Sequence, residues 1–184
     1  EDRIENEDED GVDKQYSINY TNRLNDDGQK LTIDLQYGDS KQTENSPVTV
    51  NGILSEDNSQ ITNSKEKLLQ IDYVLPIGEN SQFEIGHKST LQDLDSDFRV
   101  NLLDPLATFD PSNAITFKQN IYAFYTQYGS KINKFSYLLG LRLENTQITI
   151  DQPTSGDFNK KNYTGLFPTV NLNQQMRLIF LSVI

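Results

Sequence analysis

Few residues in this chain could perform chemistry. His87 is the only histidine among 184 residues, and cysteine is absent. Any Ser–His–Asp triad would have to use His87, and a metal site with several histidine ligands cannot form. Thiolate catalysis, disulfide bonds and cysteine-based zinc sites are excluded too. We therefore expect no enzymatic activity and no cofactor, and we expect His87 to be a strand-end residue near an interface.

Three alternate aspartates come closest to a metal site. Asp93, Asp95 and Asp97 have the spacing that supplies the first oxygen ligands of a calcium-binding loop. Phe98 follows them, however, where such a loop needs a glycine. The sequence favours a solvated acidic loop, with calcium binding as the alternative.

The charge of the chain argues against nucleic-acid binding. Sixteen Lys and Arg residues stand against 27 Asp and Glu residues, so the formal net charge is −11. Such a balance offers no electrostatic attraction for phosphate backbones. Acidic residues crowd the first 14 positions, which predicts an exposed loop over 1–14. No apolar run is long enough for a transmembrane helix, and no signal peptide is expected at Glu1.

Alternation of apolar and polar residues dominates the chain. The hydrophobic fraction is only 35%, yet there are nine phenylalanines and nine tyrosines, which suits strands with one apolar face. No segment of convincing length has a helical period. The sequence predicts an all-β fold with seven strand runs: 16–20, 31–37, 69–75, 83–85, 121–128, 137–143 and about 166–173. The run 121–128 has aromatic residues at both even and odd positions, so its two faces stay unassigned.

The connections between these runs alternate in length. Short connections are expected at 25–29, 76–80 and 129–134, and long loops at 39–66, 91–118 and 148–164. Up-and-down barrels of the outer membrane have short periplasmic turns and long extracellular loops. The expected strands of roughly 8–11 residues suffice to cross a bilayer at a tilt.

The alternate residues of the expected strands suit the two faces of a membrane barrel. A lipid-facing band would contain Leu31, Ile33, Leu35, Leu69, Ile71, Leu139, Leu141 and Leu143. An aromatic girdle near the strand ends would contain Tyr16, Tyr20, Tyr37 and Tyr137. A wet lumen would receive Asp34, Gln36, Gln70, Asp72, Glu84, Arg142 and Glu144. Arg142 and Glu144 could contact a passing ligand, or pair with a plug or with neighbouring strands.

The order and spacing of three segments resemble the barrel of TonB-dependent outer-membrane receptors, particularly the outer-membrane β-barrel family common in Bacteroidetes. These segments are 117–125, 135–144 and 162–172, and the likeness extends over roughly 14–173. The resemblance implies an antiparallel up-and-down segment of about seven strands within a larger barrel. We expect a single partial barrel domain over 1–184, with the acidic loop 1–14, strands and loops over 15–173, and an irregular tail at 174–184.

The resemblance also implies a function and partners. Receptors of this kind import a substrate such as a siderophore or a glycan across the outer membrane. Their barrel of about 22 strands surrounds a plug domain, through which a TonB-type protein transduces energy. Expected partners are thus outer-membrane lipid, a plug, further barrel strands and the TonB-type protein, with no nucleic acid. The alternative is a soluble or secreted β-sandwich that binds carbohydrate or mediates adhesion.

Overall fold

The computed structural model describes residues 2–103 and 109–174. These residues form seven long strands and one short strand, joined by turns. The elements are β1 (Arg3–Glu5), β2 (Asp8–Arg23), β3 (Lys30–Val50), β4 (Ile53–Ile77), β5 (Ser81–Leu102), β6 (Asn113–Ile132), β7 (Phe135–Gln152) and β8 (Asp157–Gln174).

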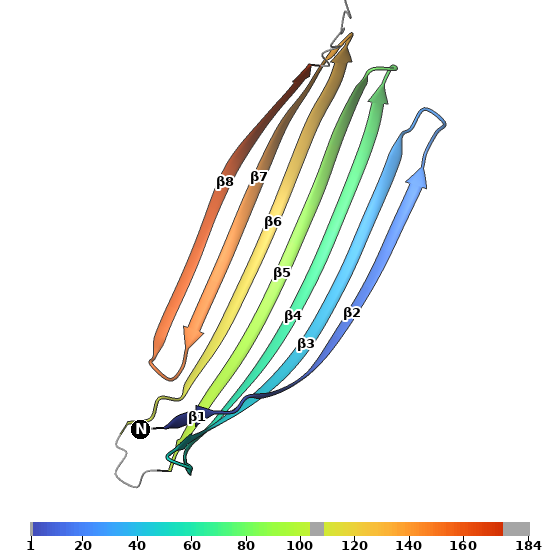
Figure 1. Cartoon of the computed structure of the whole chain (residues 1–184). Coiled ribbons are helices and arrows are strands. Elements are labelled where there is room, and N and C mark those ends of the chain that lie inside the picture. Colours follow the sequence, from blue (N-terminus) through green and yellow to red (C-terminus); the bar gives the residue numbers. More distant parts are fainter. Residues whose placement is uncertain (1, 104–108, 175–184) are drawn as a thin grey trace, which may run out of the picture.

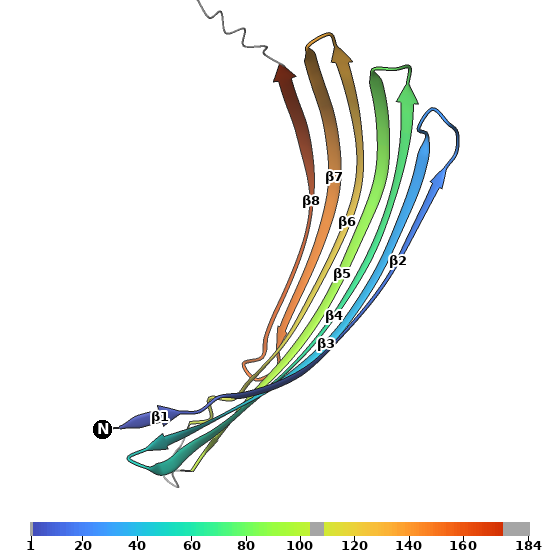
Figure 2. The ribbon, with the colours of Figure 1, turned by 45° about the vertical axis from the view of Figure 1, so that its right-hand side comes forward.

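All the strands belong to one antiparallel sheet. Its order follows the chain from β2 to β8, and β1 also pairs with β3, beyond the end of β2. Figure 1 shows neighbours in sequence lying side by side, and Figure 2 shows that the sheet is strongly curved. The sheet does not close on itself, because β2 and β8 pair on one side only. The expected up-and-down, all-β fold is confirmed.

The strands are much longer than the sequence predicted. They contain 16 to 25 residues apart from β1, whereas we expected 8–11. The predicted long loops 39–66, 91–118 and 148–164 are therefore wrong over most of their length. Their Ser, Thr and Asn residues occupy paired strands, because a paired backbone tolerates polar side chains on both faces when water is available on each side.

The turn between β3 and β4 explains the largest of these errors. Asn51 and Gly52 have φ angles of 51° and 78°, and Val50 pairs directly with Ile53. Two central residues with positive φ make the two-residue hairpin turn that matches the twist of the flanking strands. The expected loop 39–66 is thus a tight hairpin.

The predicted acidic loop 1–14 is also wrong, because β1 and the first residues of β2 pair with β3. The two strands keep one register along β3 and are interrupted at Asn6 and Glu7. The interruption lies opposite Pro47, whose carbonyl oxygen accepts a hydrogen bond from the Asn6 backbone at 3.2 Å. Proline has no N–H to return, so the ladder loses a bond there.

The sheet is a single layer with almost no core of its own. Among the described residues, Val48 and Ala123 are the only buried hydrophobic residues. A β-sandwich needs a second sheet to cover its apolar face, so the sandwich alternative is wrong for the described fold. No helix long and apolar enough to cross a membrane occurs in the part of the chain that the structure describes. The predicted tail 174–184 lies, after Gln174, outside the described residues.

Candidate functional site

The register of the sheet separates an apolar face from a polar face. Directly paired residues point to the same side of a sheet, so each row of partners can be assigned to one face. The middle row of the apolar face runs from β2 to β8 through Tyr20, Ile33, Ile71, His87, Phe124, Leu143 and Leu166. The eight residues predicted to face lipid all belong to this face.

The same register assigns the faces of the run 121–128, which the sequence left open. Tyr122, Phe124 and Tyr128 lie on the apolar face, paired on β7 with Asn145, Leu143 and Leu139. The alternate residues of β6, among them Tyr125, lie on the polar face. Aromatic residues thus occupy both faces of β6, and Tyr125 is the one on the polar face, where its hydroxyl has a hydrogen-bond partner.

Tyrosines border the apolar face at both ends. Tyr16 and Tyr37 stack with ring centroids 6.3 Å apart on the side of the Asn51–Gly52 hairpin. Tyr128 and Tyr137 lie 6.2 Å apart near the short turn at Asn133. Tyr20 is the exception to the predicted girdle, since it pairs with Ile33 in the middle row.

His87 does not lie at a strand end, so that prediction was wrong. It occupies the middle row of the apolar face, and its ring packs on Phe124 with centroids 4.4 Å apart. Its Nε2 atom forms a 2.7 Å hydrogen bond with the Ser89 hydroxyl, while its Nδ1 atom is buried without a partner. The His87–Ser89 pair thus lacks the carboxylate that orients the imidazole in a Ser–His–Asp triad, because no side chain hydrogen-bonds to Nδ1.

The polar face carries a continuous network that begins on β4. The Tyr125 hydroxyl on β6 donates a hydrogen bond to the Asp72 carboxylate on β4. The ring crosses β5 over Gly86, where an added Cβ atom would lie 2.4 Å from the ring. Gln70 donates a second hydrogen bond to Asp72 at 2.8 Å.

The network continues onto β7 through Arg142. Its guanidinium carbon lies 5.9 Å from the centroid of the Tyr125 ring, within the range of a cation–π interaction. Arg142 also forms an ion pair with Glu144 at 2.7 Å, and Thr146 donates to Glu144 at 3.3 Å. The ion pair therefore joins Arg142 and Glu144 to each other within β7, whereas the sequence had offered a ligand, a plug or neighbouring strands as their partners.

Glu84 on β5 accepts a second cluster of hydrogen bonds on the polar face. The amides of Gln82 and Gln127 both donate hydrogen bonds to its carboxylate. Together with the network around Tyr125, Glu84 lines a hollow of about 580 Å³. The remaining lining residues include two lysines, Lys30 and Lys88.

Three of the charged groups that line the hollow are held by neighbouring side chains, namely Asp72, Glu84 and Arg142. The described residues contain no group of three or more His, Cys, Asp or Glu side chains that could hold a metal ion. What this face offers is a set of carboxylates, amides and cations that a second surface or a polar ligand can contact. The sequence analysis placed Asp72, Glu84, Arg142 and Glu144 here but missed Tyr125 and Gly86.

The three aspartates of the calcium alternative lie on a strand. Asp93, Asp95 and Asp97 are alternate residues of β5, on the face that carries the apolar rows, and an extended backbone spaces them along the strand instead of wrapping them around an ion. Asp93 pairs with Lys118 at 4.0 Å, and Asp97 pairs with Arg99 at 2.7 Å. A calcium loop is therefore not formed.

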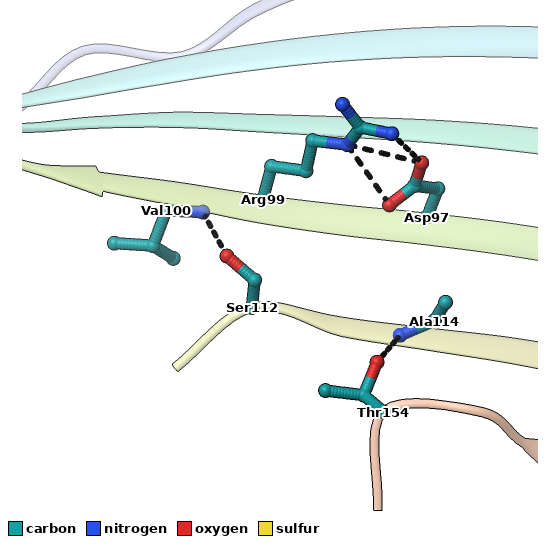
Figure 3. Close-up of polar contacts among 6 residues, drawn as sticks. All are labelled: Asp97, Arg99, Val100, Ser112, Ala114 and Thr154. Atoms are coloured by element: carbon teal, nitrogen blue, oxygen red, sulfur yellow. Dashed lines mark hydrogen bonds and ion pairs between the residues drawn. The ribbon is translucent and has the colours of Figure 1, made fainter. Parts of the chain in front are cut away.

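Figure 3 shows how side chains fasten the strand ends near Arg99. The Ser112 hydroxyl accepts a hydrogen bond from the Val100 backbone at 2.9 Å, which ties the start of β6 to β5. The Thr154 hydroxyl accepts one from Ala114 at 3.1 Å, which ties the β7–β8 turn to β6. These bonds stiffen the end of the sheet that lies far from the apolar rows.

Two solved structures resemble this chain in fold to different degrees. The unliganded ferric citrate transporter FecA matches with a TM-score of 0.65 and 14% identity, over 91% of this chain and 25% of that chain. The ferric yersiniabactin uptake receptor FyuA from Yersinia pestis matches with a TM-score of 0.49 and 11% identity, over 87% of this chain and 24% of that chain. This chain therefore spans about a quarter of the length of each. A comparison with curated proteins gave no match.

A family model gives the assignment. The model described as "Outer membrane protein beta-barrel family" matches residues 22–178, which is most of the chain. The sheet has the two faces that such a barrel needs, one apolar and one polar. Its fold is that of part of an outer-membrane β-barrel, and its location is the outer membrane. The chain belongs to the outer membrane β-barrel family.

Proposed function

We propose that the chain forms one wall of a barrel that imports a ligand across the outer membrane. The observation that carries the proposal is the two-faced sheet itself. One face is apolar over the depth of a bilayer, and the other carries the hydrogen-bonded network from Asp72 to Glu144. A polar inner face is what a water-filled or plugged barrel lumen has, so this wall can line the passage of a polar ligand.

The length of the strands supports a role in ligand capture. β4 has 25 residues, far more than the 9–11 or so that a tilted strand needs to cross a bilayer. The excess lies on the side of the Asn51–Gly52 hairpin, beyond the stacked Tyr16 and Tyr37. Long hairpins of this kind stand on the extracellular side of outer-membrane barrels. They would form the rim that a ligand meets first.

We infer a ferric chelate as the class of ligand. The support is the likeness in fold to a transporter of ferric citrate, which covers 91% of this chain. An anionic chelate would also find cations on the polar face, namely Lys30, Lys88 and Arg142. A glycan is the competing class, and the experiment below separates the two.

The partners follow from the same proposal. β2 and β8 each leave an unpaired edge, so further barrel strands must pair with both to remove the open hydrogen-bonding groups. A plug domain would contact the polar hollow around Tyr125, and a TonB-type protein would act on the plug. No enzymatic role is proposed, since His87 and Ser89 lie on the apolar face and Nδ1 of His87 has no carboxylate partner.

Uptake in the source cells tests the proposal. The gene that encodes the protein would be deleted, and entry of iron-55 citrate, of other labelled ferric chelates and of labelled oligosaccharides would be measured with and without a protonophore. We expect loss of energy-dependent uptake of one ferric chelate and its return with the restored gene. Loss of oligosaccharide uptake with intact chelate uptake would contradict the ligand class. Unchanged uptake of every probe would contradict import.

A further inference from the structure

A belt of lysines crosses the apolar side of the sheet just beyond the stacked tyrosines. One register row of this side runs through Lys14, Asp39, Lys65, Asp93, Lys118, Thr149 and Lys160. Lys67 lies in the row on one side of it and Lys41 in the row on the other. We call these six lysines the lysine belt. They come from five of the seven long strands, namely β2, β3, β4, β6 and β8, so the belt is built by the register of the sheet and not by a loop.

The belt lies at the depth of lipid headgroups. The last row that is apolar on β2, β3 and β4 contains Ile18, Leu35 and Leu69, and the row with Tyr16, Tyr37 and Lys67 follows it. The central lysine row comes next. Successive rows on one face of a sheet are about 7 Å apart, so this row stands roughly 14 Å beyond Leu69, past the aromatic border. It faces outward, on the side that carries the hydrocarbon-facing residues.

The charge of the belt is opposite to that of the chain. Its three rows contain the six lysines and four aspartates, Asp39, Asp93, Asp95 and Asp151, while the whole chain carries −11. In the central row each aspartate lies between two lysines, which reduces repulsion among them. Six of the chain's 16 Lys and Arg residues thus gather in three adjacent rows of the apolar side.

The ammonium groups of the belt remain available to an external anion. Lys118 lies 4.0 Å from Asp93, and its side chain is 57% exposed. No other ion pair within 4.0 Å forms between the belt lysines and these aspartates in the described part of the chain. Four belt lysines line a hollow of about 650 Å³, namely Lys14, Lys41, Lys65 and Lys118.

We propose that the lysine belt binds the phosphate groups of lipids in the leaflet on the long-hairpin side. Lysines close to an anionic membrane surface contribute attraction that falls off within a Debye length. The belt would fix the depth of the barrel and hold a ring of anionic lipid around it. This role depends on membrane embedding and not on which ligand the barrel carries, so it stands or falls separately from the import proposal.

Native mass spectrometry of the full-length barrel tests the proposal. Purified protein in detergent would be titrated with phosphatidylglycerol, with phosphatidylcholine and with inorganic phosphate. We expect the triple variant Lys14→Gln/Lys65→Gln/Lys118→Gln to bind phosphatidylglycerol about tenfold or more weakly, following the attraction of each lysine. The matching arginine variant should bind like the unchanged protein, which also shows that substitution at these positions leaves the barrel folded.

The control variant removes the same charge elsewhere. Lys131→Gln/Lys134→Gln/Lys161→Gln changes two residues near the short turn and one on the opposite parity of β8. We expect it to keep full phosphatidylglycerol binding. Equal loss in both triple variants, or none in either, would overturn the proposal. Displacement of the lipid by millimolar inorganic phosphate would also overturn it, because the site would then select a free anion.

Discussion

Tyr125 and Asp72 are joined across a strand to which neither belongs. Tyr125 lies on β6, Asp72 lies on β4, and the hydroxyl of the first donates to the carboxylate of the second over Gly86 of β5. The absent side chain at Gly86 makes room for the ring. Three strands are thereby locked in register by one side chain, on the face that we assign to the lumen.

Gly86→Ala should weaken the barrel through this contact. The new methyl group would lie 2.4 Å from the Tyr125 ring, so the ring must move and the bond to Asp72 is lost. We expect the free energy of unfolding to fall by about 1–3 kcal/mol. Denaturant titration of the full-length barrel refolded into vesicles measures it. Gly38→Ala is the control, because its Cβ atom would come no closer than 4.0 Å to another residue; equal effects of both substitutions would contradict the argument.

Tyr125→Phe tests the stabilising contribution of the Tyr125 hydroxyl apart from that of its ring. It removes the donor to Asp72 and keeps the packing over Gly86, so the expected loss is about 0.5–1.5 kcal/mol. A double-mutant cycle with Asp72→Ala should give a coupling energy of about 0.5–3 kcal/mol between the two positions. A coupling energy of zero would mean that the two side chains do not interact in the membrane.

The faces of the strands could be predicted from the sequence because alternation is a local property. Leu139, Leu141 and Leu143 must share a side in any extended backbone, and their polar neighbours must share the other. The all-β class also followed, since no helical period competed, whereas a two-sheet sandwich stayed open as the alternative. The assignment failed only where both parities were aromatic, at 121–128.

The lengths of the strands could not be predicted from hydrophobicity, because polar residues continue the pairing beyond the membrane. The Asn51–Gly52 pair was the signal that could have corrected this, since it is the strongest short hairpin signal and lies inside the expected loop 39–66. The link from Tyr125 to Asp72 could not be predicted either. It depends on the register of three strands, which no local pattern specifies.

Leu143→Lys tests which face meets lipid. Leu143 lies in the middle row of the apolar face, where a lysine would cost about 2–4 kcal/mol of unfolding free energy in a bilayer. Val74→Lys is the matched control, since Val74 lies on the polar face directly opposite Glu84 and a lysine there gains an acidic neighbour. The measurement is denaturant titration in lipid vesicles. A larger loss of unfolding free energy from Val74→Lys than from Leu143→Lys would reverse the assignment of the faces.

Asp97 and Arg99 should give a measurable pH dependence at the far end of the sheet. The hydrogen bonds that Arg99 donates lower the pKa of the Asp97 carboxyl from its ordinary value. A lowered pKa in the folded state means that the pair stabilises the strand end above the unfolded pKa of about 3.9 and that this stabilisation is lost as the pH falls through the lowered value. Arg99→Gln removes the donor, so the pKa of Asp97 should rise towards its ordinary value.

The carboxyl carbon-13 resonance of Asp97 reports this titration directly. In the unchanged barrel the midpoint should lie below that of the Arg99→Gln variant. Lys118→Gln is the control, because Lys118 pairs with Asp93 and should leave the midpoint of Asp97 where it was. Arg99→Gln with an unmoved midpoint would show that the pair is open in solution. The side-chain ties at Ser112 and Thr154 would then be the contacts that hold this end of the sheet together.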